Sequence, residues 1–249
     1  MSDYFIFGEN DDAVDTRAYN AQVYRRNIVT MHPYQYNSNE IPGGNGDIFI
    51  PLDRFPNYTE RYQVVINSAN AESDSDAFIN ALFAKRGYQT LKDSFDTSVY
   101  TIAVLNSQFD IETVRERDVF KMNIEFNRKP QRFLNSGRSN IAVSSGDILD
   151  NPTNFPSKPR IFFKGNGTMT FSNGGNSYYF DYDGPGDTGY ICVDCESMEC
   201  YQWAYQQNRN TYLELGDNNG FPMLHPNGTI VSITEDMTDV LIAPRWWKI

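Results

Sequence analysis

The alternation of apolar and polar side chains is clearest in residues 119–126, which read VFKMNIEF. The apolar residues of one predicted face are Phe120, Met122, Ile124 and Phe126, and the polar residues of the other are Lys121, Asn123 and Glu125. Because successive side chains of a strand point to opposite faces, this pattern predicts a strand with one wet side. Residues 64–67 and 98–105 predict two further strands before residue 130.

Residues 73–87, SDSDAFINALFAKRG, have the period of an amphipathic helix. Ser73 is placed to cap this helix, and Gly87 is placed to end it. The apolar residues expected on its buried side are Phe78, Ile79, Leu82 and Phe83. It is the one helix that the pattern predicts with clear periodicity.

After residue 140 the pattern changes to short strands separated by turns. The runs RIFFK and TMTFS flank Gly165, Asn166 and Gly167, residues that accept positive φ, so they predict a hairpin. Further turns are SNGGNS and DGPGDTG. Strands at this spacing with polar turns are typical of a β-sandwich. The fold class predicted is mainly β, with an α+β N-terminal domain that has one helix and a C-terminal sandwich.

Three prolines, Pro152, Pro156 and Pro159, lie in the stretch NPTNFPSKPR. Proline fixes φ and removes a backbone donor, which excludes helix and favours an extended segment. We interpret residues 141–159 as a linker and lead-in to the second domain. The alternative, a ligand-contacting loop, is the weaker one from composition.

The composition is that of a globular protein: 40% of the 249 residues are apolar and 14% are aromatic. The net charge of −11 argues against nucleic acid as a tight partner, since such binding needs a basic stripe to displace counterions. The beginning MSDYFIFGENDD has no secretory pattern, and no apolar run reaches the roughly 20 residues of a membrane helix. We therefore expect a soluble protein made in a reducing cytoplasm.

The residues that commonly carry chemistry are few. Cys192, Cys195 and Cys200 lie in CVDCESMEC, where a CxxC pair raises zinc or redox chemistry, but buried thiols are the favoured interpretation. His32 and His225 each precede a proline and are expected in turns or on the surface. Four carboxylates could line a cleft or merely solvate turns, and we favour the latter: Asp181, Asp183, Asp194 and Glu196. No catalytic, metal or cofactor site is predicted.

Aromatic residues suggest one candidate binding site. Tyr201, Trp203 and Tyr205 alternate in YQWAY, so they would share a face if the segment were extended. They could then stack on sugars, although packing in a core is the favoured interpretation. At least one of the two tryptophans near the C-terminus, Trp246 and Trp247, is expected to be buried.

Several pieces of the sequence, in this order, resemble the siphophage distal tail protein family. They are IPGGNGDIFI, FINALFAKRGYQTLKDSFDTSVYTIAVL, FNRKPQRFLNSG, NPTNFPSKPRIFFKGNGTMTF, ICVDCESMECYQ and IAPRWWKI, which together extend over residues 41–249. None of these pieces is a catalytic signature. The resemblance is specific because all of them occur in the same order as in the family. The cysteines depart from the family pattern.

The resemblance implies a non-enzymatic virion protein at the tail tip, the distal tail hub. Residues 1–140 would form a hexameric ring, and residues 141–249 would be a galectin-like β-sandwich. The partners implied are the tail tube protein, a tail-associated fibre or lysin, and receptor-binding proteins. The alternative function is a carbohydrate-binding module for the host wall, and a hydrolase is the weakest reading.

A sixfold ring of this chain would be strongly acidic, since six copies carry 6 × −11 = −66 formal charges. We expect part of this charge to line the lumen, where like charges repel within about 10 Å at 0.1 M salt. DNA would then pass through the ring without specific binding.

Overall fold

The computed structural model describes residues 3–27, 34–52, 54–106, 111–115, 118–185, 189–216, 220–234 and 236–249. The fold is mainly β with one α-helix among these residues, which confirms the predicted class. The chain divides into two compact units, Met1–Arg132 with Ile249, and Phe133–Lys248. The sequence places the boundary at residue 140, whereas unit 1 ends at Arg132. No helix within the described ranges is long and apolar enough to cross a membrane.

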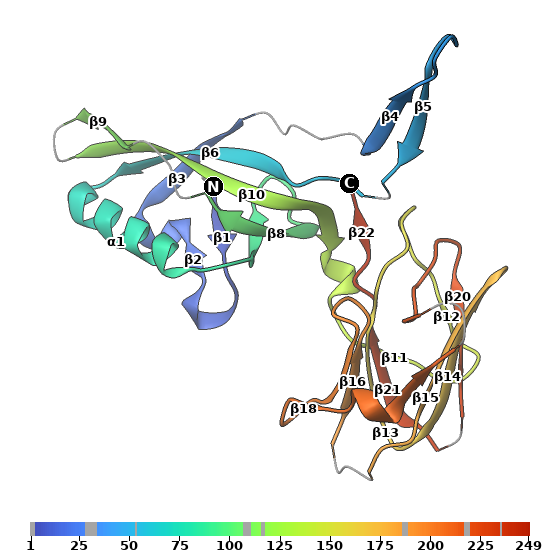
Figure 1. The fold of residues 1–249 in the computed structure, drawn as a ribbon. Coiled ribbons are helices and arrows are strands. Elements are labelled where there is room, and N and C mark those ends of the chain that lie inside the picture. Colours follow the sequence, from blue (N-terminus) through green and yellow to red (C-terminus); the bar gives the residue numbers. More distant parts are fainter. Residues whose placement is uncertain are drawn as a thin grey trace. The chain divides into compact units, whose positions relative to one another are not determined.

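Unit 1 is built on one large antiparallel sheet and carries a separate two-stranded hairpin (Figure 1). The sheet has the order β2-β1-β7-β8-β10-β6-β3, and β9 also pairs with β10. Its strands are β1 Phe5–Phe7, β2 Val14–Asp15, β3 Ala21–Asn27, β6 Tyr58–Asn67, β7 Gln89–Asp93, β8 Val99–Leu105, β9 Ile111–Arg115 and β10 Val119–Leu134. The hairpin consists of β4 Tyr36–Glu40 and β5 Asp47–Pro51.

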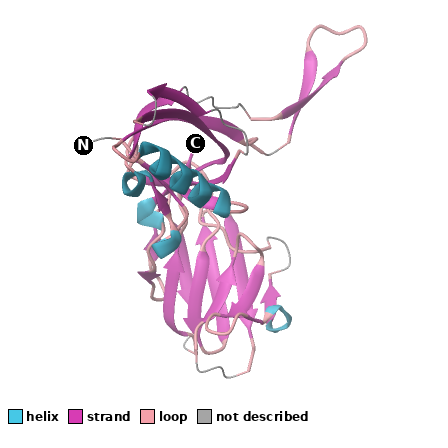
Figure 2. Ribbon diagram, turned by 90° about the vertical axis from the view of Figure 1, so that its left-hand side faces the viewer, coloured by secondary structure: helices cyan, strands magenta, loops and turns pink. Residues whose placement is uncertain are grey.

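The core of unit 1 lies between this sheet and helix α1, Ala71–Ala84, which covers one of its faces (Figure 2). Met122, Ile124 and Phe126 of β10 are buried there, as the alternation predicts, while Phe120 is partly buried against the same core. From the helix, Phe78 and Leu82 enter this core.

Three details of the predicted helix are wrong. The helix ends at Ala84 with Lys85 in the C-terminal capping position, three residues before Gly87. The helix begins at Ala71 with Asn70 in the capping position, so Ser73 is an interior residue and not the cap. The buried stripe is Ala71, Ser75, Phe78 and Leu82, and Phe83 is 46% exposed. Phe83 follows Leu82 directly, and one residue turns the helix by about 100°, which moves it off the stripe.

A charged pair is buried on the core side of this sheet. Glu60 of β6 and Arg128 of β10 form an ion pair, and both side chains are almost fully buried. The guanidinium carbon of Arg128 also lies 5.5 Å from the ring centroid of Tyr58. A buried cation requires such partners, because leaving it unpaired would cost several kcal/mol, on the order of 3–5.

Unit 2 is a sandwich of two antiparallel sheets, as predicted. The first has the order β11-β21-β13-β16-β17-β18 and the second β12-β20-β14-β15-β19. The strands are β11 Ile141–Ala142, β12 Ile148–Leu149, β13 Arg160–Lys164, β14 Gly167–Asn173, β15 Asn176–Tyr182, β16 Ile191–Asp194, β17 Glu199–Gln202, β18 Gln207–Asn208, β19 Leu213–Leu215, β20 Thr229–Ile233 and β21 Thr238–Ala243. A last short strand, β22 Trp247–Lys248, pairs with β10 and belongs to neither sheet of the sandwich. Side chains from both sheets form one core, which includes Ile161, Phe163, Phe171, Phe180 and Val193.

The glycine turn after RIFFK is a crossing between sheets, not the hairpin that its residues predict. β13 pairs with β16 and β21, whereas β14 pairs with β15 and β20. Gly165 has φ +86°, and a Cβ there would lie 2.1 Å from the carbonyl oxygen of Asp236. Gly167 has φ +138° and similarly approaches the hydroxyl of Thr234. Glycine is therefore required by this close crossing as well as by its φ angles.

The proline-containing segment lies inside unit 2 rather than between the two units. Ser157 is fully buried and donates its hydroxyl hydrogen bond to the carbonyl of Pro244, 2.8 Å away. The Asn151 amide donates to the carbonyls of Phe155 and Leu224. The linker interpretation is thus corrected: the backbone is held by side chains and by other segments of the sandwich, which satisfy its polar groups.

Candidate assembly surface

The β4–β5 hairpin contributes no residue to the core of either unit. Among the described residues its strands pair with each other and with no third strand, in the register Tyr36↔Pro51 to Glu40↔Asp47. Every residue of both strands is exposed. The hairpin therefore has no covering layer from the described part of its own chain.

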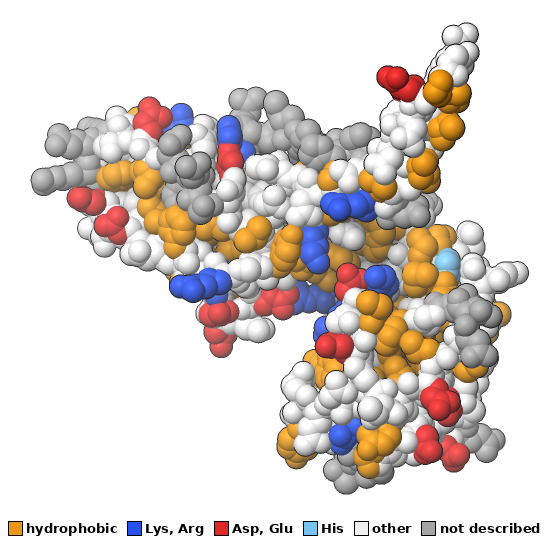
Figure 3. Space-filling view, viewed as in Figure 1, with side chains coloured by type: hydrophobic (Ala, Val, Ile, Leu, Met, Phe, Trp, Pro, Cys, Tyr) orange, Lys and Arg blue, Asp and Glu red, His pale blue; other side chains and the backbone are white. Residues whose placement is uncertain are grey.

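Apolar side chains occur on both faces of this hairpin. Tyr36 and Phe49 share one face and meet at 6.1 Å between ring centroids, in an edge-to-face arrangement. Ile48 and Ile50 alternate with Phe49 and so lie on the other face. Phe49 is 62% exposed and Ile48 is 52% exposed. Figure 3 shows hydrophobic side chains gathered along the hairpin on the face in view.

Such an arrangement is poorly stable in water by itself. A lone two-stranded hairpin is at best marginally stable, and large exposed apolar patches mark interaction surfaces. Covering a side chain such as Phe49 or Ile50 contributes about 1.5–3 kcal/mol when burial is complete. The geometry therefore favours a partner that covers one or both faces. The sequence pattern does not single out this surface, because its polar strand YNSNE has no buried face.

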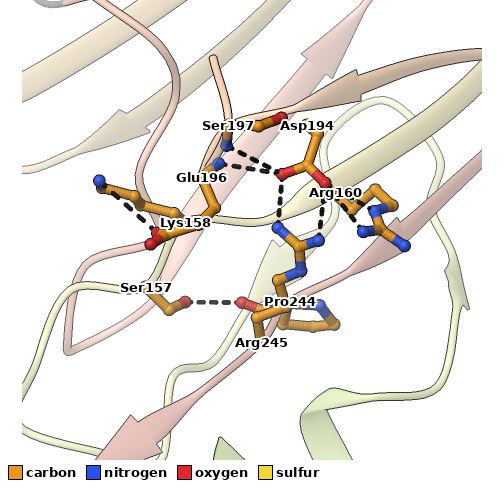
Figure 4. Close-up of polar contacts among 8 residues, drawn as sticks. All are labelled: Ser157, Lys158, Arg160, Asp194, Glu196, Ser197, Pro244 and Arg245. Atoms are coloured by element: carbon orange, nitrogen blue, oxygen red, sulfur yellow. Dashed lines mark hydrogen bonds and ion pairs between the residues drawn. The ribbon is translucent and has the colours of Figure 1, made fainter. Parts of the chain in front are cut away.

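A second group of polar residues in unit 2 surrounds the carboxylate of Asp194 (Figure 4). Arg245 donates two hydrogen bonds, Nη1 to Oδ1 at 2.6 Å and Nη2 to Oδ2 at 2.7 Å. Arg160 adds Nε to Oδ2 at 2.9 Å, and the backbone N–H groups of Glu196 and Ser197 also donate to Oδ1. The carboxylate is buried, with 7% of the side chain exposed.

The electrostatics of Asp194 are dominated by these partners. Burial by itself raises the pKa of the carboxyl group, but the hydrogen bonds and charges of Arg245 and Arg160 outweigh it and hold the pKa well below 3.8. Asp194 is therefore ionised and saturated with donors. It joins β16, β13 and the segment after β21, which is a structural role.

The four carboxylates considered as cleft residues do not form an acid–base pair. Asp181 accepts a hydrogen bond from Thr168, and Asp183 accepts one from Asn166, both at the exposed end of the second sheet. Glu196 lies 3.6 Å from the ammonium of Lys158. These three fit the predicted solvent-facing role, whereas Asp194 does not, because Arg245 approaches it from 51 residues away.

All three cysteines are buried and reduced. Cys195 and Cys200 belong to the core between the sheets, while Cys192 lies on the opposite face beside Tyr201. Burial raises the pKa of Cys192 to about 11 and that of Cys200 to about 12. Such thiols are poor nucleophiles and ligands. Within the described residues, no three His, Cys, Asp or Glu side chains come together as a metal site.

The histidines and the aromatic residues considered as site residues do not come together in one place. His225 stacks on Tyr178, with Tyr178 Oη 3.0 Å from His225 Nε2, and His32 lies outside the described residues. Trp203 contacts Tyr201, with ring centroids 6.2 Å apart, so these two share a face. Tyr205 does not extend this row, since the strand ends at Gln202 and the chain enters a turn. Trp246 is buried, as expected.

Comparison with protein-family models and with curated proteins finds no match. Solved structures do match. The Dit protein (gp 19.1) of phage SPP1, described as a paradigm of hub adsorption apparatus in Gram-positive infecting phages, aligns with a TM-score of 0.69 at 11% identity, covering 97% of this chain and 98% of that chain. Chains of the phage P2 baseplate in its activated conformation align with TM-scores of 0.59 and 0.58 at 12% identity, covering 97% of each chain. This chain therefore has the fold of these phage hub and baseplate proteins, and the resemblance is confirmed at the level of the fold.

Proposed function

We propose that this chain is a non-enzymatic structural protein of a phage virion, the hub at the distal end of the tail. The likeness to the SPP1 Dit protein supports this, because it extends over nearly the full length of both chains. The hub would connect the tail tube to the tail tip and carry receptor-binding and tail-associated proteins. Its work would be done by large complementary surfaces.

The observation that carries the proposal is the uncovered β4–β5 hairpin. A chain that worked alone would leave Phe49, Ile48 and Ile50 in water on both sides of a two-stranded sheet. In an assembly the same residues would pack against another copy or an adjoining tail protein. The hairpin is thus interpreted as an arm through which copies of this chain join.

We infer that the assembly is a closed ring of six copies formed by residues 1–140, with the sandwich of residues 141–249 projecting outward. A ring needs one heterologous interface whose rotation closes on itself, and a protruding arm received by the next copy satisfies this requirement. Six copies would carry the −66 formal charges noted above. An acidic lumen would let DNA pass without adhering.

The mass and symmetry of the particle test this proposal. Multi-angle light scattering of the purified full-length chain should give six times the mass of 28.6 kDa, and negative-stain images should show rings. A monomer at high protein concentration, together with tails that contain no ring of this chain, would contradict the proposal. Images of assembled tails would also place the ring between tube and tip or elsewhere.

A further inference from the structure

The outer face of the first sheet of the sandwich carries a row of aromatic side chains. Ile161, Val193 and Cys200 point into the core, so the neighbouring positions point outward. Phe162, Cys192 and Tyr201 pair across β13, β16 and β17 and form one outward row. Most of this row is covered: Phe162 is 7% exposed and Cys192 is fully buried.

Trp203 provides much of this cover while keeping a large part of its own ring in water. Its indole packs edge-to-face with Phe162, with ring centroids 5.0 Å apart at 89°, and lies nearly parallel to Tyr201. The guanidinium carbon of Arg160 lies 5.9 Å from the same indole. Trp203 nevertheless remains 43% exposed. The ring is thus held from three directions and presents a fixed apolar surface to solvent.

The charges around this indole are neutralised within the protein. Arg160 is paired with Asp194 at 2.9 Å, and Lys164 is paired with Asp239 at 2.7 Å. Burial raises the pKa of Tyr201 well above its ordinary value of 10, so its phenol is neutral. The cation that contacts the indole, Arg160, is thus already paired with a carboxylate. The electrostatic complement of this surface is an uncharged ligand.

Polar groups suited to hydroxyls border the same surface. Asn208 pairs with Tyr201 across β17 and β18, so its exposed amide lies on the face of the aromatic row. The turn between these strands is fixed by the Gln206 amide, which donates to the carbonyl of Trp203 at 2.9 Å. Tyr205 in this turn is 72% exposed. An aromatic surface with a few fixed polar groups is the usual composition of a small-ligand site.

We propose that Trp203 is the stacking platform of a binding site for neutral hexose units of a polysaccharide. The apolar C–H face of a pyranose ring would lie on the electron-rich face of the indole. The Asn208 amide and the Arg160 guanidinium would bond ring hydroxyls. Because Phe162, Tyr201 and Arg160 already hold the indole, little ordering entropy is lost on binding. Tyr201 would support the platform instead of stacking on sugar. This site is independent of the hub function.

Affinity electrophoresis of the full-length chain tests the proposal. The gels contain dextran, galactan, mannan or laminarin as neutral polymers, and polygalacturonate as the charged control. At least one neutral polymer should retard the wild-type chain, and polygalacturonate should not. Retardation by none of the four neutral polymers would overturn the proposal and leave this face as a protein contact. Retardation by polygalacturonate alone would overturn it as well.

The variants locate the site. Trp203→Ala should weaken retardation at least tenfold, and Asn208→Ala a few-fold. Tyr179→Ala is the matched control, because Tyr179 is 42% exposed on the second sheet of the same sandwich, and it should bind within twofold of wild type. Equal binding by wild type and Trp203→Ala would contradict the assignment. Since Trp203→Ala also uncovers Phe162, Trp203→Phe and a thermal melt separate lost binding from lost folding.

Discussion

Two hairpins of this chain, β4–β5 and β16–β17, have similar residue types and the same antiparallel pairing, but they differ in how far they are buried. In β16 every residue is buried, and the hairpin lies within a six-stranded sheet that packs on a second sheet. In β4–β5 every residue is exposed, including Phe49 and Ile50. Both contain aromatic or β-branched residues, and both have regular antiparallel register.

This difference in burial indicates which contacts stabilise each hairpin. The β16–β17 hairpin is stabilised by its own chain, through the core and through the ion pairs of Asp194. The β4–β5 hairpin has no such support among the described residues, and in the proposed assembly another polypeptide supplies it. Substitutions in the first should therefore change the stability of unit 2, and substitutions in the second should change assembly.

The largest effect on stability is expected at Asp194. Asp194→Asn removes the negative charge that faces Arg245 and Arg160 and should lower the free energy of unfolding by about 3 kcal/mol. Asp239→Asn is the matched control, because Asp239 pairs with Lys164 at an exposed position and should change stability by about 0.5 kcal/mol or less. Urea unfolding of both variants measures the difference. Equal effects would show that burial does not distinguish the two pairs.

The crossing between the sheets gives the next effect. Gly165→Ala places a Cβ against the carbonyl of Asp236 at positive φ and should cost about 2 kcal/mol or more. Gly175→Ala is the control in a hairpin turn, where a Cβ meets open space and the φ angle is ordinary. It should lie within about 0.5 kcal/mol of wild type. Thermal unfolding should rank the two, and a harmless Gly165→Ala would mean that the crossing is looser than described.

Acid provides a weaker probe of the same carboxylate. The pKa of Asp194 is lowered in the folded state, so the stability it contributes is present above its ordinary pKa of 3.8 and is lost as the pH falls below that value. The gap between wild type and Asp194→Asn should be constant above about pH 5 and narrow as the pH falls below about 3.8. A gap that already narrows near neutral pH would contradict the assigned ion pairs.

The smallest effect on stability is expected in the exposed hairpin. Phe49→Glu with Ile50→Lys should change the unfolding free energy by about 0.5 kcal/mol or less while abolishing the oligomer. Ile148→Glu with Ile230→Lys is the matched control, since these residues pair across β12 and β20 and have similar exposure. It should leave the oligomer intact. Light scattering and urea unfolding of the two double variants decide between assembly and folding as the role of the hairpin.

The alternation of apolar and polar residues predicts a strand when one face of that strand is buried and the other is in water. The alternation in residues 119–126 marks the buried face of β10, because one side of that strand meets a core and the other meets water. The same principle fails at β4–β5, where both faces are exposed and no alternation arises. A surface completed by another chain leaves little trace in the pattern of one chain.

Long-range pairing is the other reason why sequence reasoning fell short. The turn at Gly165–Gly167 has hairpin chemistry, but β13 finds its partners in β16 and β21, which come later in the chain. The sequence predicts Asp194 to be a solvated turn residue, because it does not reveal that Arg245 lies beside it in the fold. Tyr205 leaves the aromatic row because the turn begins after Gln202. The pairing of β13 and the surroundings of Asp194 depend on residues remote in sequence, which local propensity does not register, whereas the place of Tyr205 depends on a local turn that the alternation does not reveal.

Hydrogen exchange of the β4–β5 backbone tests the central claim most directly. The account predicts that amides of residues 36–51 are strongly protected in assembled particles and exchange rapidly in the Phe49→Glu, Ile50→Lys chain. Amides of β16–β17 should be equally protected in both. Rapid exchange of the hairpin inside the wild-type particle would contradict the claim that another polypeptide covers it.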